Sequence, residues 1–253
     1  MNLQDKVIVI TGGGQGLGRA MAVNLASYGA KLALIDLNEE LLKETVSLVE
    51  QAGSSAQYFL ANVTNEAEVE ATFAQINQQC NGIDGLINNA GILRDGMFVK
   101  AKDGEVIKKM SLAQFQSVID VNLTGVFLCG REAAVHMIEG KRKGVIINMS
   151  SIARGGNMGQ TNYAASKAGV VAMTVTWARE LGRHGIRVGA IAPGVIRTAM
   201  TDAMKPEMRD RLESMKPVGR LGEADEIAHT VKYIFENEFF TGRVVEIDGG
   251  LCM

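Results

Sequence analysis

The sequence predicts a single α/β domain, residues 1–253, built on a doubly wound sheet of seven parallel strands. Two observations lead to this fold class. Short apolar, β-branched runs alternate along the chain with longer segments of helical periodicity, and no linker, repeat or low-complexity stretch separates them. Strict alternation of strands and helices is typical of a parallel sheet that is covered on both faces and joined by right-handed crossovers.

The predicted strands are seven short runs, at 6–11, 31–36, 56–61, 83–88, 144–150, 186–192 and 243–248. Helices are expected between them, among others at 16–27 and 38–51. In the second of these, Asn38 is the expected N-cap and Gly53 follows the last turn. The pattern therefore places turns and loops at both ends of every strand.

Two segments interrupt this alternation. Residues 94–110 contain Asp103-Gly104, a dipeptide typical of hairpin turns. Residues 194–222 form a long connection of the kind that either covers a site or is disordered. The methionines between 200 and 215 are interpreted as an apolar lid rather than as metal ligands.

Composition excludes several classes of protein. The chain has 26 Lys plus Arg against 28 Asp plus Glu, so no basic field favours nucleic acid. The three cysteines, Cys80, Cys129 and Cys252, are far apart and lack metal-ligand spacing, which indicates a reduced compartment, the cytoplasm, and no metal site. A charged N-terminus and the absence of 18 consecutive uncharged apolar residues argue against a signal peptide and a membrane span.

A glycine-rich stretch, "TGGGQGLG", follows the first predicted strand and precedes a helix. Gly12, Gly16 and Gly18 would let the backbone turn tightly and bring its N–H groups, with the positive end of the helix dipole, against a pyrophosphate. A plain tight turn is the alternative for the glycines alone. Their place at the first strand of an α/β pattern favours dinucleotide binding.

A carboxylate, Asp36, ends the second predicted strand, 18 residues after Gly18. In that place it would accept both hydroxyls of an adenosine ribose and repel a 2′-phosphate, and the turn holds neutral Gln15 where a basic residue could pair that phosphate. A solvated strand-end aspartate is the alternative. The pattern predicts NAD as the cofactor in preference to NADP.

Tyr163 and Lys167 lie four residues apart in "NYAASKAG", so on a helix they share one face. A lysine ammonium and the positive ring of oxidised nicotinamide would both favour phenolate and lower the tyrosine pKa, which makes the pair a general acid/base. Such a pair by itself is usually on the surface. Its neighbours point to catalysis.

These neighbours are expected at the carboxyl ends of the strands, where open parallel sheets bind ligands. Ser151 ends the fifth predicted strand, twelve residues before Tyr163, and its hydroxyl could hold a carbonyl oxygen. Asn122 lies in an apolar helix, where an amide is more often a core or cap group than a catalytic one. Residues 88–91 and Pro193-Gly194 follow two further strands.

Jointly, these motifs identify the chain as similar to the short-chain dehydrogenase/reductase family over essentially its whole length, with a Rossmann fold. The matching elements are Thr11-Gly12-x3-Gly16-x-Gly18, "NNAG" at 88–91, Asn122, Ser151, Tyr163-x3-Lys167 and Pro193-Gly194-x3-Thr198. Within the family, "APGVIRTAMT", "PVGRLGEADEIA" and the terminal "GGLCM" resemble the 3-oxoacyl-[acyl-carrier-protein] reductase branch and its acyl-CoA relatives.

The resemblance implies a role for each matching position. Tyr163 would give a proton to the carbonyl, Lys167 would bind the nicotinamide ribose and lower the tyrosine pKa, Ser151 would orient the carbonyl, and Asn122 would hold a water in the proton relay. The implied cofactor-binding residues are Gly12, Gln15, Gly16, Leu17, Gly18, Asp36, Asn62, Val63, Asn89, Ala90, Gly91, Tyr163, Lys167, Pro193, Gly194, Ile196 and Thr198.

Three departures from the family pattern matter. The gap from Ser151 to Tyr163 is one residue short, so Ser150 satisfies the family spacing; Ser151 is preferred because strand ends are fixed by sheet register. Segment 94–110 is longer than usual and would lie near the substrate entrance or a subunit contact. Many relatives in this branch use NADP, whereas Asp36 favours NAD and hence the oxidising direction.

The predicted function is interconversion of a 3-oxoacyl thioester and its 3-hydroxyacyl counterpart, on acyl carrier protein or coenzyme A, by a homotetramer. Alternatives are a family dehydrogenase for another secondary alcohol, such as a steroid, sugar or polyol, and a nucleotide-sensing scaffold without catalysis. The cations at 141–143, Arg183 and His184 would either contact an acidic carrier or only complement helix dipoles.

Overall fold

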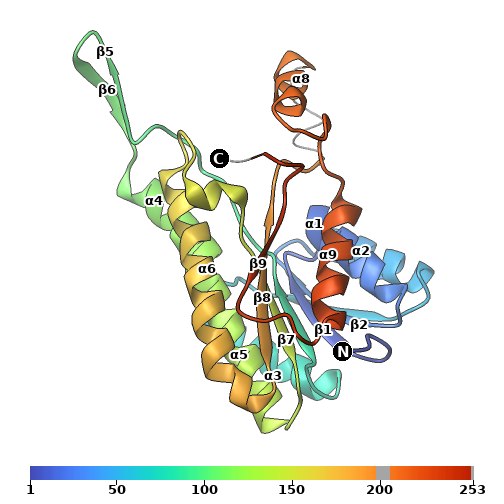
Figure 1. The fold of residues 1–253 in the computed structure, drawn as a ribbon. Coiled ribbons are helices and arrows are strands. Elements are labelled where there is room, and N and C mark those ends of the chain that lie inside the picture. Colours follow the sequence, from blue (N-terminus) through green and yellow to red (C-terminus); the bar gives the residue numbers. More distant parts are fainter. Residues whose placement is uncertain (198–205, 252–253) are drawn as a thin grey trace.

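The computed structural model describes residues 1–197 and 206–251, and a seven-stranded parallel sheet runs through its centre (Figure 1). The strand order is β3-β2-β1-β4-β7-β8-β9. The strands are β1 (Val7–Thr11), β2 (Lys31–Asp36), β3 (Ala56–Leu60), β4 (Gly85–Asn88), β7 (Val145–Met149), β8 (Arg187–Pro193) and β9 (Val244–Ile247). This confirms the predicted fold class, with strand ends shifted by one or two residues.

Helices cover both faces of the sheet (Figure 1). One layer contains α1 (Gly16–Ala26), α2 (Glu39–Gln51) and α9 (Ala224–Glu236). The other contains α3 (Glu66–Gln79), α4 (Leu112–Ile119), the π turn η1 (Asp120–Thr124), α5 (Gly125–Glu139) and α6 (Thr161–Leu181). Short 3-10 turns follow β7 and α6, namely η2 (Ile152–Gly155) and η3 (Gly182–His184).

Two apolar clusters hold these layers together, because successive side chains of a strand point to opposite faces. On β1, Ile8 and Ile10 join the cluster beneath α1 and α9, whereas Val9 joins the cluster beneath α3 and α5. All three side chains are fully buried. The strands are therefore apolar on both faces, which is why they read as continuous apolar runs in the sequence.

Helix α2 begins as its sequence predicts. The Asn38 side chain accepts a hydrogen bond from the Leu41 amide and caps the helix. Two glutamates stand in its first turn, where the helix dipole favours negative charge. Local capping thus fixes where the chain turns after β2, next to Asp36.

A continuous helix from Leu112 to Glu139, comprising α4, η1 and α5, is long and apolar enough to cross a membrane by length and composition alone. Its buried residues, however, include Val126, Cys129 and Ala133, and the helix packs against α3, α6 and the sheet. This is the arrangement of a core helix in an α/β layer.

The insertion folds as the predicted hairpin. Strands β5 (Val99–Lys102) and β6 (Glu105–Lys109) pair antiparallel, and the turn residues Asp103 and Gly104 have φ values of 53° and 83°. Positive φ at both central positions is the signature of the tight hairpin turn that Asp-Gly favours. Every residue of the two strands is exposed, and the hairpin projects from the body of the molecule (Figure 1).

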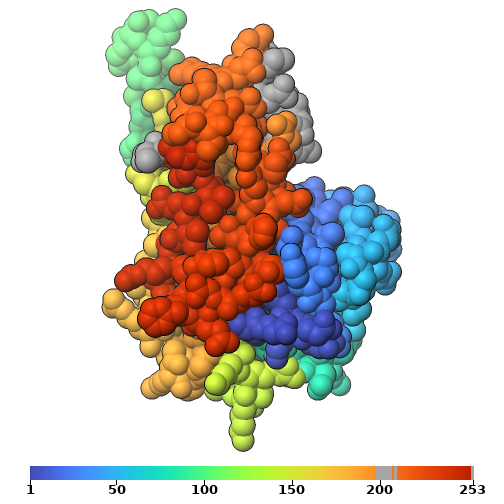
Figure 2. Space-filling view, turned by 45° about the vertical axis from the view of Figure 1, so that its right-hand side comes forward, coloured from blue at the N-terminus to red at the C-terminus, as the bar shows by residue number. Residues whose placement is uncertain are grey.

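The long connection after β8 contains α8 (Pro206–Ser214). Figure 2 shows this segment, in orange, standing at the same end of the molecule as the green hairpin. Of the expected lid, Met200 and Met204 lie outside the described residues, as does Thr198, and Met215 is exposed. Cys252 also lies outside them, while Cys80 and Cys129 are both free thiols.

The basic residues that would either contact an acyl carrier or complement helix dipoles lie at the edge of the sheet away from the cleft. Residues 141–143 come directly before β7, and Arg183 and His184 come shortly before β8, so all of them sit at the amino ends of the strands. Arg142 also forms an ion pair with buried Asp84 at 3.1 Å. Their positions after the C-terminal ends of α5 and α6 fit the helix-dipole interpretation, and contact with an acidic carrier stays a prediction.

Candidate active site

A cleft of about 380 Å³ opens at the carboxyl ends of β1, β2 and β4. This is the place where the strand order reverses direction, the usual ligand site of an open parallel sheet. Nine residues predicted to bind the cofactor line it: Gly12, Gln15, Leu17, Asp36, Asn62, Val63, Asn89, Ala90 and Gly91. Five lining residues were missed by sequence reasoning: Ile35, Leu37, Ala61, Ile92 and Val121.

Leu37 is the most informative of the missed residues. Its side chain is 72% exposed beside Asp36, so it offers an apolar surface at the mouth of the cleft. A flat apolar ring such as adenine would bury that surface favourably. An exposed leucine after a strand carries no distinct signal in the sequence, because periodicity reports only buried faces.

The glycine turn is tightly packed. Gly12 and Gly16 have φ values of 64° and 55°, which glycine adopts without strain. A Cβ on Gly18 would lie 2.0 Å from the Gly12 carbonyl oxygen, so Gly18 permits close packing and does not line the cleft. The Asn89 side chain donates to the carbonyls of Thr11 and Gly12, both at 3.1 Å, and ties the turn to β4.

Helix α1 begins directly after this turn. Within the described part of the chain, no side chain caps its N-terminus, and no acidic residue stands in its first turn. The first N–H groups of the helix, together with its dipole, are thus free to receive an anion. A pyrophosphate fits this arrangement.

Asp36, the last residue of β2, accepts hydrogen bonds from three backbone amides. One carboxylate oxygen accepts from the Gly14 amide at 3.1 Å, and the other accepts from the amides of Leu37 and Asn38 at 2.7 and 3.3 Å. These bonds fix the carboxylate at the rim of the cleft. Ribose hydroxyls could donate to its remaining lone pairs.

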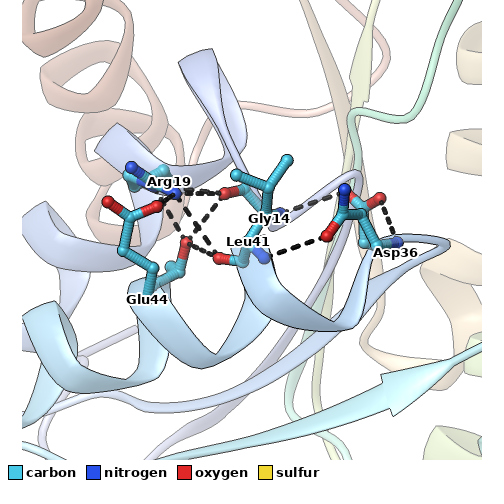
Figure 3. Close-up of polar contacts among 7 residues, drawn as sticks. Gly14, Arg19, Asp36, Leu41 and Glu44 are labelled. Atoms are coloured by element: carbon cyan, nitrogen blue, oxygen red, sulfur yellow. Dashed lines mark hydrogen bonds and ion pairs between the residues drawn. The ribbon is translucent and has the colours of Figure 1, made fainter.

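Arg19 is a cation beside the turn whose role the sequence did not predict. Its guanidinium donates to the Gly14 carbonyl at 2.8 Å, to the Thr45 hydroxyl at 3.1 Å and to Glu44 at 2.5 Å (Figure 3). Its charge is therefore paired and directed toward α2, away from Asp36. Only the fold reveals this contact, because Arg19 and Glu44 are 25 residues apart.

The two neighbouring serines after β7 have different environments. The Ser150 hydroxyl is buried and donates to the Lys167 carbonyl at 2.9 Å. Ser151 is partly exposed, accepts from the Ala153 amide at 3.1 Å as the N-cap of η2, and forms a side-chain hydrogen bond with Tyr163. Ser151, which the strand end predicts, is thus the serine that reaches Tyr163.

Tyr163 and Lys167 lie on one face of α6, as their spacing predicts. The Lys167 ammonium is 5.7 Å from the centre of the Tyr163 ring and donates to the Met149 carbonyl at the end of β7, at 2.7 Å. Complete burial lowers the pKa of Lys167 to about 8. At neutral pH the group is still mostly a cation.

The pKa of Tyr163 differs from the sequence expectation. It is raised, mainly because burial disfavours the phenolate; the hydrogen bond with Ser151 lowers it, and the Asp95 carboxylate raises it. The expected lowering by Lys167 is absent, because the ammonium faces the ring and the Met149 carbonyl. In the protein without cofactor, Tyr163 is a protonated phenol at neutral pH.

Asn122 is fully buried in the π turn η1. Its amide oxygen accepts from the Ile92 N–H at 2.8 Å, and its amide nitrogen donates to the Ile92 carbonyl at 3.0 Å. Ile92 lines the cleft, so Asn122 holds the loop after β4 against it. The cap interpretation of this amide matches these contacts, and single π turns often mark functional sites.

The remaining predicted residues lie behind the cleft or beside it. Gly194 packs on Asp248, where a Cβ would come within 2.7 Å of the backbone, and its amide donates to Ile247. Ile196 is buried and bridges to Gly222. Pro193 is the buried last residue of β8. None of the three lines the cleft of the described structure.

Comparisons with known proteins agree with this geometry. A family model described as Enoyl-(Acyl carrier protein) reductase matches residues 12–252. The chain is 39% identical to the 3-oxoacyl-[acyl-carrier-protein] reductase FabG of Thermotoga maritima, over all of both chains. It is 37% identical to the (3R)-3-hydroxyacyl-CoA dehydrogenase of Rattus norvegicus, covering all of this chain and 98% of that one.

A solved structure is equally similar. The crystal structure of levodione reductase matches with a TM-score of 0.87 and 37% identity, over 98% of each chain. Full-length matches at this identity, together with the turn, cleft and tyrosine-lysine pair, identify both the fold and the type of cofactor. The chain belongs to the short-chain dehydrogenase/reductase family and is a nicotinamide-dependent oxidoreductase.

Proposed function

We propose that this oxidoreductase uses NAD(H) to interconvert a 3-oxoacyl thioester and the corresponding 3-hydroxyacyl thioester. The observation that carries the proposal is Tyr163, whose hydroxyl is hydrogen-bonded to Ser151 and whose ring lies 5.7 Å from the ammonium of buried Lys167, at the same sheet edge as the cleft. The relatives named for 3-oxoacyl and 3-hydroxyacyl substrates support this substrate class.

The preference for NAD rests on charge. Asp36 places a carboxylate at the ribose end of the cleft, where a 2′-phosphate would meet repulsion at short range. Arg19, a cation beside the turn, is already paired with Glu44, and Gln15 is neutral. The adenosine ribose of NAD would instead donate its hydroxyls to Asp36.

In the reduction, the chain's own groups handle the proton. The nicotinamide, when bound, supplies the hydride. The Ser151 hydroxyl would hold the ketone oxygen, and Tyr163 would donate its phenolic proton to that oxygen as it gains electrons. The raised pKa keeps Tyr163 protonated beforehand, and the Ser151 hydrogen bond favours the phenolate that remains. Lys167, whose ammonium lies 5.7 Å from the centre of the ring, would add to this stabilisation only in the complex with the cofactor. In the oxidation the same phenol must first lose its proton, which higher pH favours.

Asn122 takes a positioning role in this proposal. The amide oxygen and the amide nitrogen of Asn122 both form hydrogen bonds with the backbone of Ile92. The Asn122 side chain therefore holds the loop that forms the cleft wall. Asn89 does the same for the glycine turn. Thr198 and Ile196 remain proposed contacts of the carboxamide.

The test compares Tyr163→Phe with the native protein, using acetoacetyl-CoA and either NADH or NADPH. Loss of the general acid should lower kcat by about a thousandfold, within the usual range for such groups. NADH affinity, followed by nucleotide fluorescence, should stay within about twofold, because the phenol hydroxyl is not its main contact. Substantial residual turnover would contradict the mechanism, and a clear preference of the native protein for NADPH would contradict the role of Asp36.

A second candidate substrate is a small ketone without a thioester. The similarity to levodione reductase favours it, because that relative matches the whole chain as well as the thioester enzymes do. Rates with levodione and acetoacetyl-CoA, measured side by side with NADH, separate the two. The thioester proposal requires the larger kcat/KM for acetoacetyl-CoA.

Assembly and location complete the proposal. Apolar side chains on the outer face of the long helix, Leu112, Phe127, Val135 and Ile138, are exposed in the single chain. Burying them between copies would stabilise a homotetramer. The free thiols Cys80 and Cys129 fit a location in the cytoplasm, where thiols stay reduced. Light scattering should give four times the mass of the chain, and a monomer at micromolar concentration would contradict this assembly.

A further inference from the structure

A second cavity, of about 240 Å³, lies at the base of the β5–β6 hairpin, apart from the cofactor cleft. It is formed where the insertion leaves and rejoins the body of the protein. Its walls are Gly96, Met97, Lys100, Lys108, Met110 and Gln114. None of these residues belongs to the catalytic group or to the cofactor cleft.

Two lysines stand side by side where the hairpin lines this cavity. Lys100 on β5 is the register partner of Lys108 on β6, so their side chains leave the same face of the hairpin about 5 Å apart at Cβ. Like charges placed directly opposite in an antiparallel pair destabilise it. In the parts of the chain that the structure describes, no carboxylate forms an ion pair with either lysine. An anion between the two ammonium groups would remove this repulsion.

The acidic residues of the hairpin stand elsewhere. Glu105 is the register partner of Lys102, and Asp103 occupies the turn, so both belong to the outer tip. Lys109 pairs with Val99 one position along the ladder, on the other face. The hairpin thus offers two lysines toward the cavity and two away from it.

Two methionines give this cavity an apolar part of its wall. Met97 and Met110 contribute thioether side chains, which adapt to branched aliphatic groups. Gln114 is held in place, because its amide nitrogen donates to the carbonyls of Arg94 and Asp95. A paired cationic site beside an apolar wall suits an amphipathic ligand, with a phosphate next to an aliphatic segment, better than a free inorganic ion.

The cavity is tied to the catalytic end of α6. The Gly96 amide donates to the Gly159 carbonyl at 2.8 Å, and the Asn162 side chain donates to the carbonyls of Arg94 and Gln114. Asn162 directly precedes Tyr163. Since four residues of chain span at most about 14 Å, Gly159 cannot be farther than that from Tyr163.

We propose that this cavity binds the phosphate end of the pantetheine arm that carries the acyl thioester. Lys100 and Lys108 pair with the phosphate, and Met97 and Met110 contact the branched dimethyl group beside it, while the arm extends toward Tyr163. Both coenzyme A and acyl carrier protein contain this phosphopantetheine unit. The inference rests on the proposed thioester substrate and makes the hairpin a device for recognising its carrier.

The experiment compares two thioesters that differ only in the phosphate, acetoacetyl-4′-phosphopantetheine and acetoacetyl-pantetheine, with NADH. In the native protein, kcat/KM should be about tenfold higher for the phosphorylated substrate, as expected for two partly exposed charge-assisted contacts. In the double variant Lys100→Gln/Lys108→Gln this ratio should fall close to one, through a higher KM. The KM for NADH and the kcat should not change.

The matched control is Lys102→Gln/Lys109→Gln, which removes the same charge from the same hairpin on positions that do not line the cavity. It should keep the native ratio. If the ratio fell equally in both double variants, the site would be overturned, because the hairpin charge would then attract anions only in a general way. To identify the carrier, kcat/KM is measured with acetoacetyl-CoA and with acetoacetyl-acyl carrier protein in the native protein and in Lys100→Gln/Lys108→Gln. The carrier is the one whose kcat/KM falls more in this variant.

The two proposals fail in different ways. A native protein that reduces neither pantetheine thioester contradicts the thioester function itself. A native protein that reduces both at the same rate confirms the function but overturns the phosphate site. A variant ratio that stays at the native value overturns the site as well.

Discussion

At the glycine turn, the chain is held by backbone amides, carbonyls and the Arg19 side chain, whereas the β5–β6 hairpin is exposed along its whole length. The turn must hold a nucleotide that is the same in every reaction, so its atoms are fixed. The hairpin joins the body only through its base, at contacts such as Gly96 to Gly159. This difference fits the two proposals, in which the cofactor binds where the chain is tied to the core and the substrate carrier binds at the exposed hairpin.

The strongest test of the rigid turn is Gly18→Ala. The new Cβ would meet the Gly12 carbonyl oxygen at 2.0 Å, and neither backbone segment can move without disturbing β1 or α1. We expect a loss of about 3 kcal/mol in the free energy of unfolding, at the upper end for overpacking. Urea unfolding followed by circular dichroism measures it.

The control is Gly182→Ala, because no atom lies within 4 Å of that Cβ and the residue has a helical φ of −56°. It should be neutral or slightly stabilising, since alanine favours the helix. If the two variants lost equal stability, close packing at the turn would not be the cause.

The second test concerns charge at the cleft rim. Asp36→Asn removes the negative charge and leaves a donor opposite the Gly14 amide. We expect the KM for NADH to rise at least tenfold, the usual size for a lost hydrogen bond to a charged group, and the discrimination against NADPH to shrink. Steady-state kinetics with both nucleotides measure this change, and an unaltered nucleotide preference would show that Asp36 does not select the cofactor.

The third test uses pH. Burial lowers the pKa of Lys167 to about 8, so the ammonium is present below pH 8 and is lost as pH rises through that value. With a cation required beside Tyr163, kcat/KM for the reduction should be level at lower pH and about tenfold smaller at pH 9. The residual activity of Lys167→Arg should lack this fall, because arginine keeps its charge.

The smallest effect is expected in the hairpin. Gly104→Ala puts a Cβ on a residue with φ of 83°, which strains the turn locally. Because both strands are exposed, the global free energy of unfolding should change by less than about 0.5 kcal/mol. Trypsin should cut the hairpin lysines faster than in the native protein. A loss of stability as large as that of Gly18→Ala would mean that the hairpin belongs to the core after all.

The sequence by itself determined the sheet, the glycine turn, the hairpin turn at Asp103-Gly104 and the shared face of Tyr163 and Lys167. All of these depend on neighbours a few residues apart, whose spacing follows from helix and strand geometry. Even the choice of Ser151 over Ser150 follows from a strand end. Such local relations can be recognised in the sequence without knowledge of the fold.

Only the tertiary structure decided how distant groups meet. In the folded chain Arg19 pairs with Glu44, and the Asn122 amide forms two hydrogen bonds with the backbone of Ile92. The cations around Arg142 lie at the edge of the sheet away from the cleft. The tertiary structure also raises the pKa of Tyr163, because burial outweighs the hydrogen bond with Ser151. Burial and long-range pairing depend on how the layers pack, and no local pattern of residues encodes them.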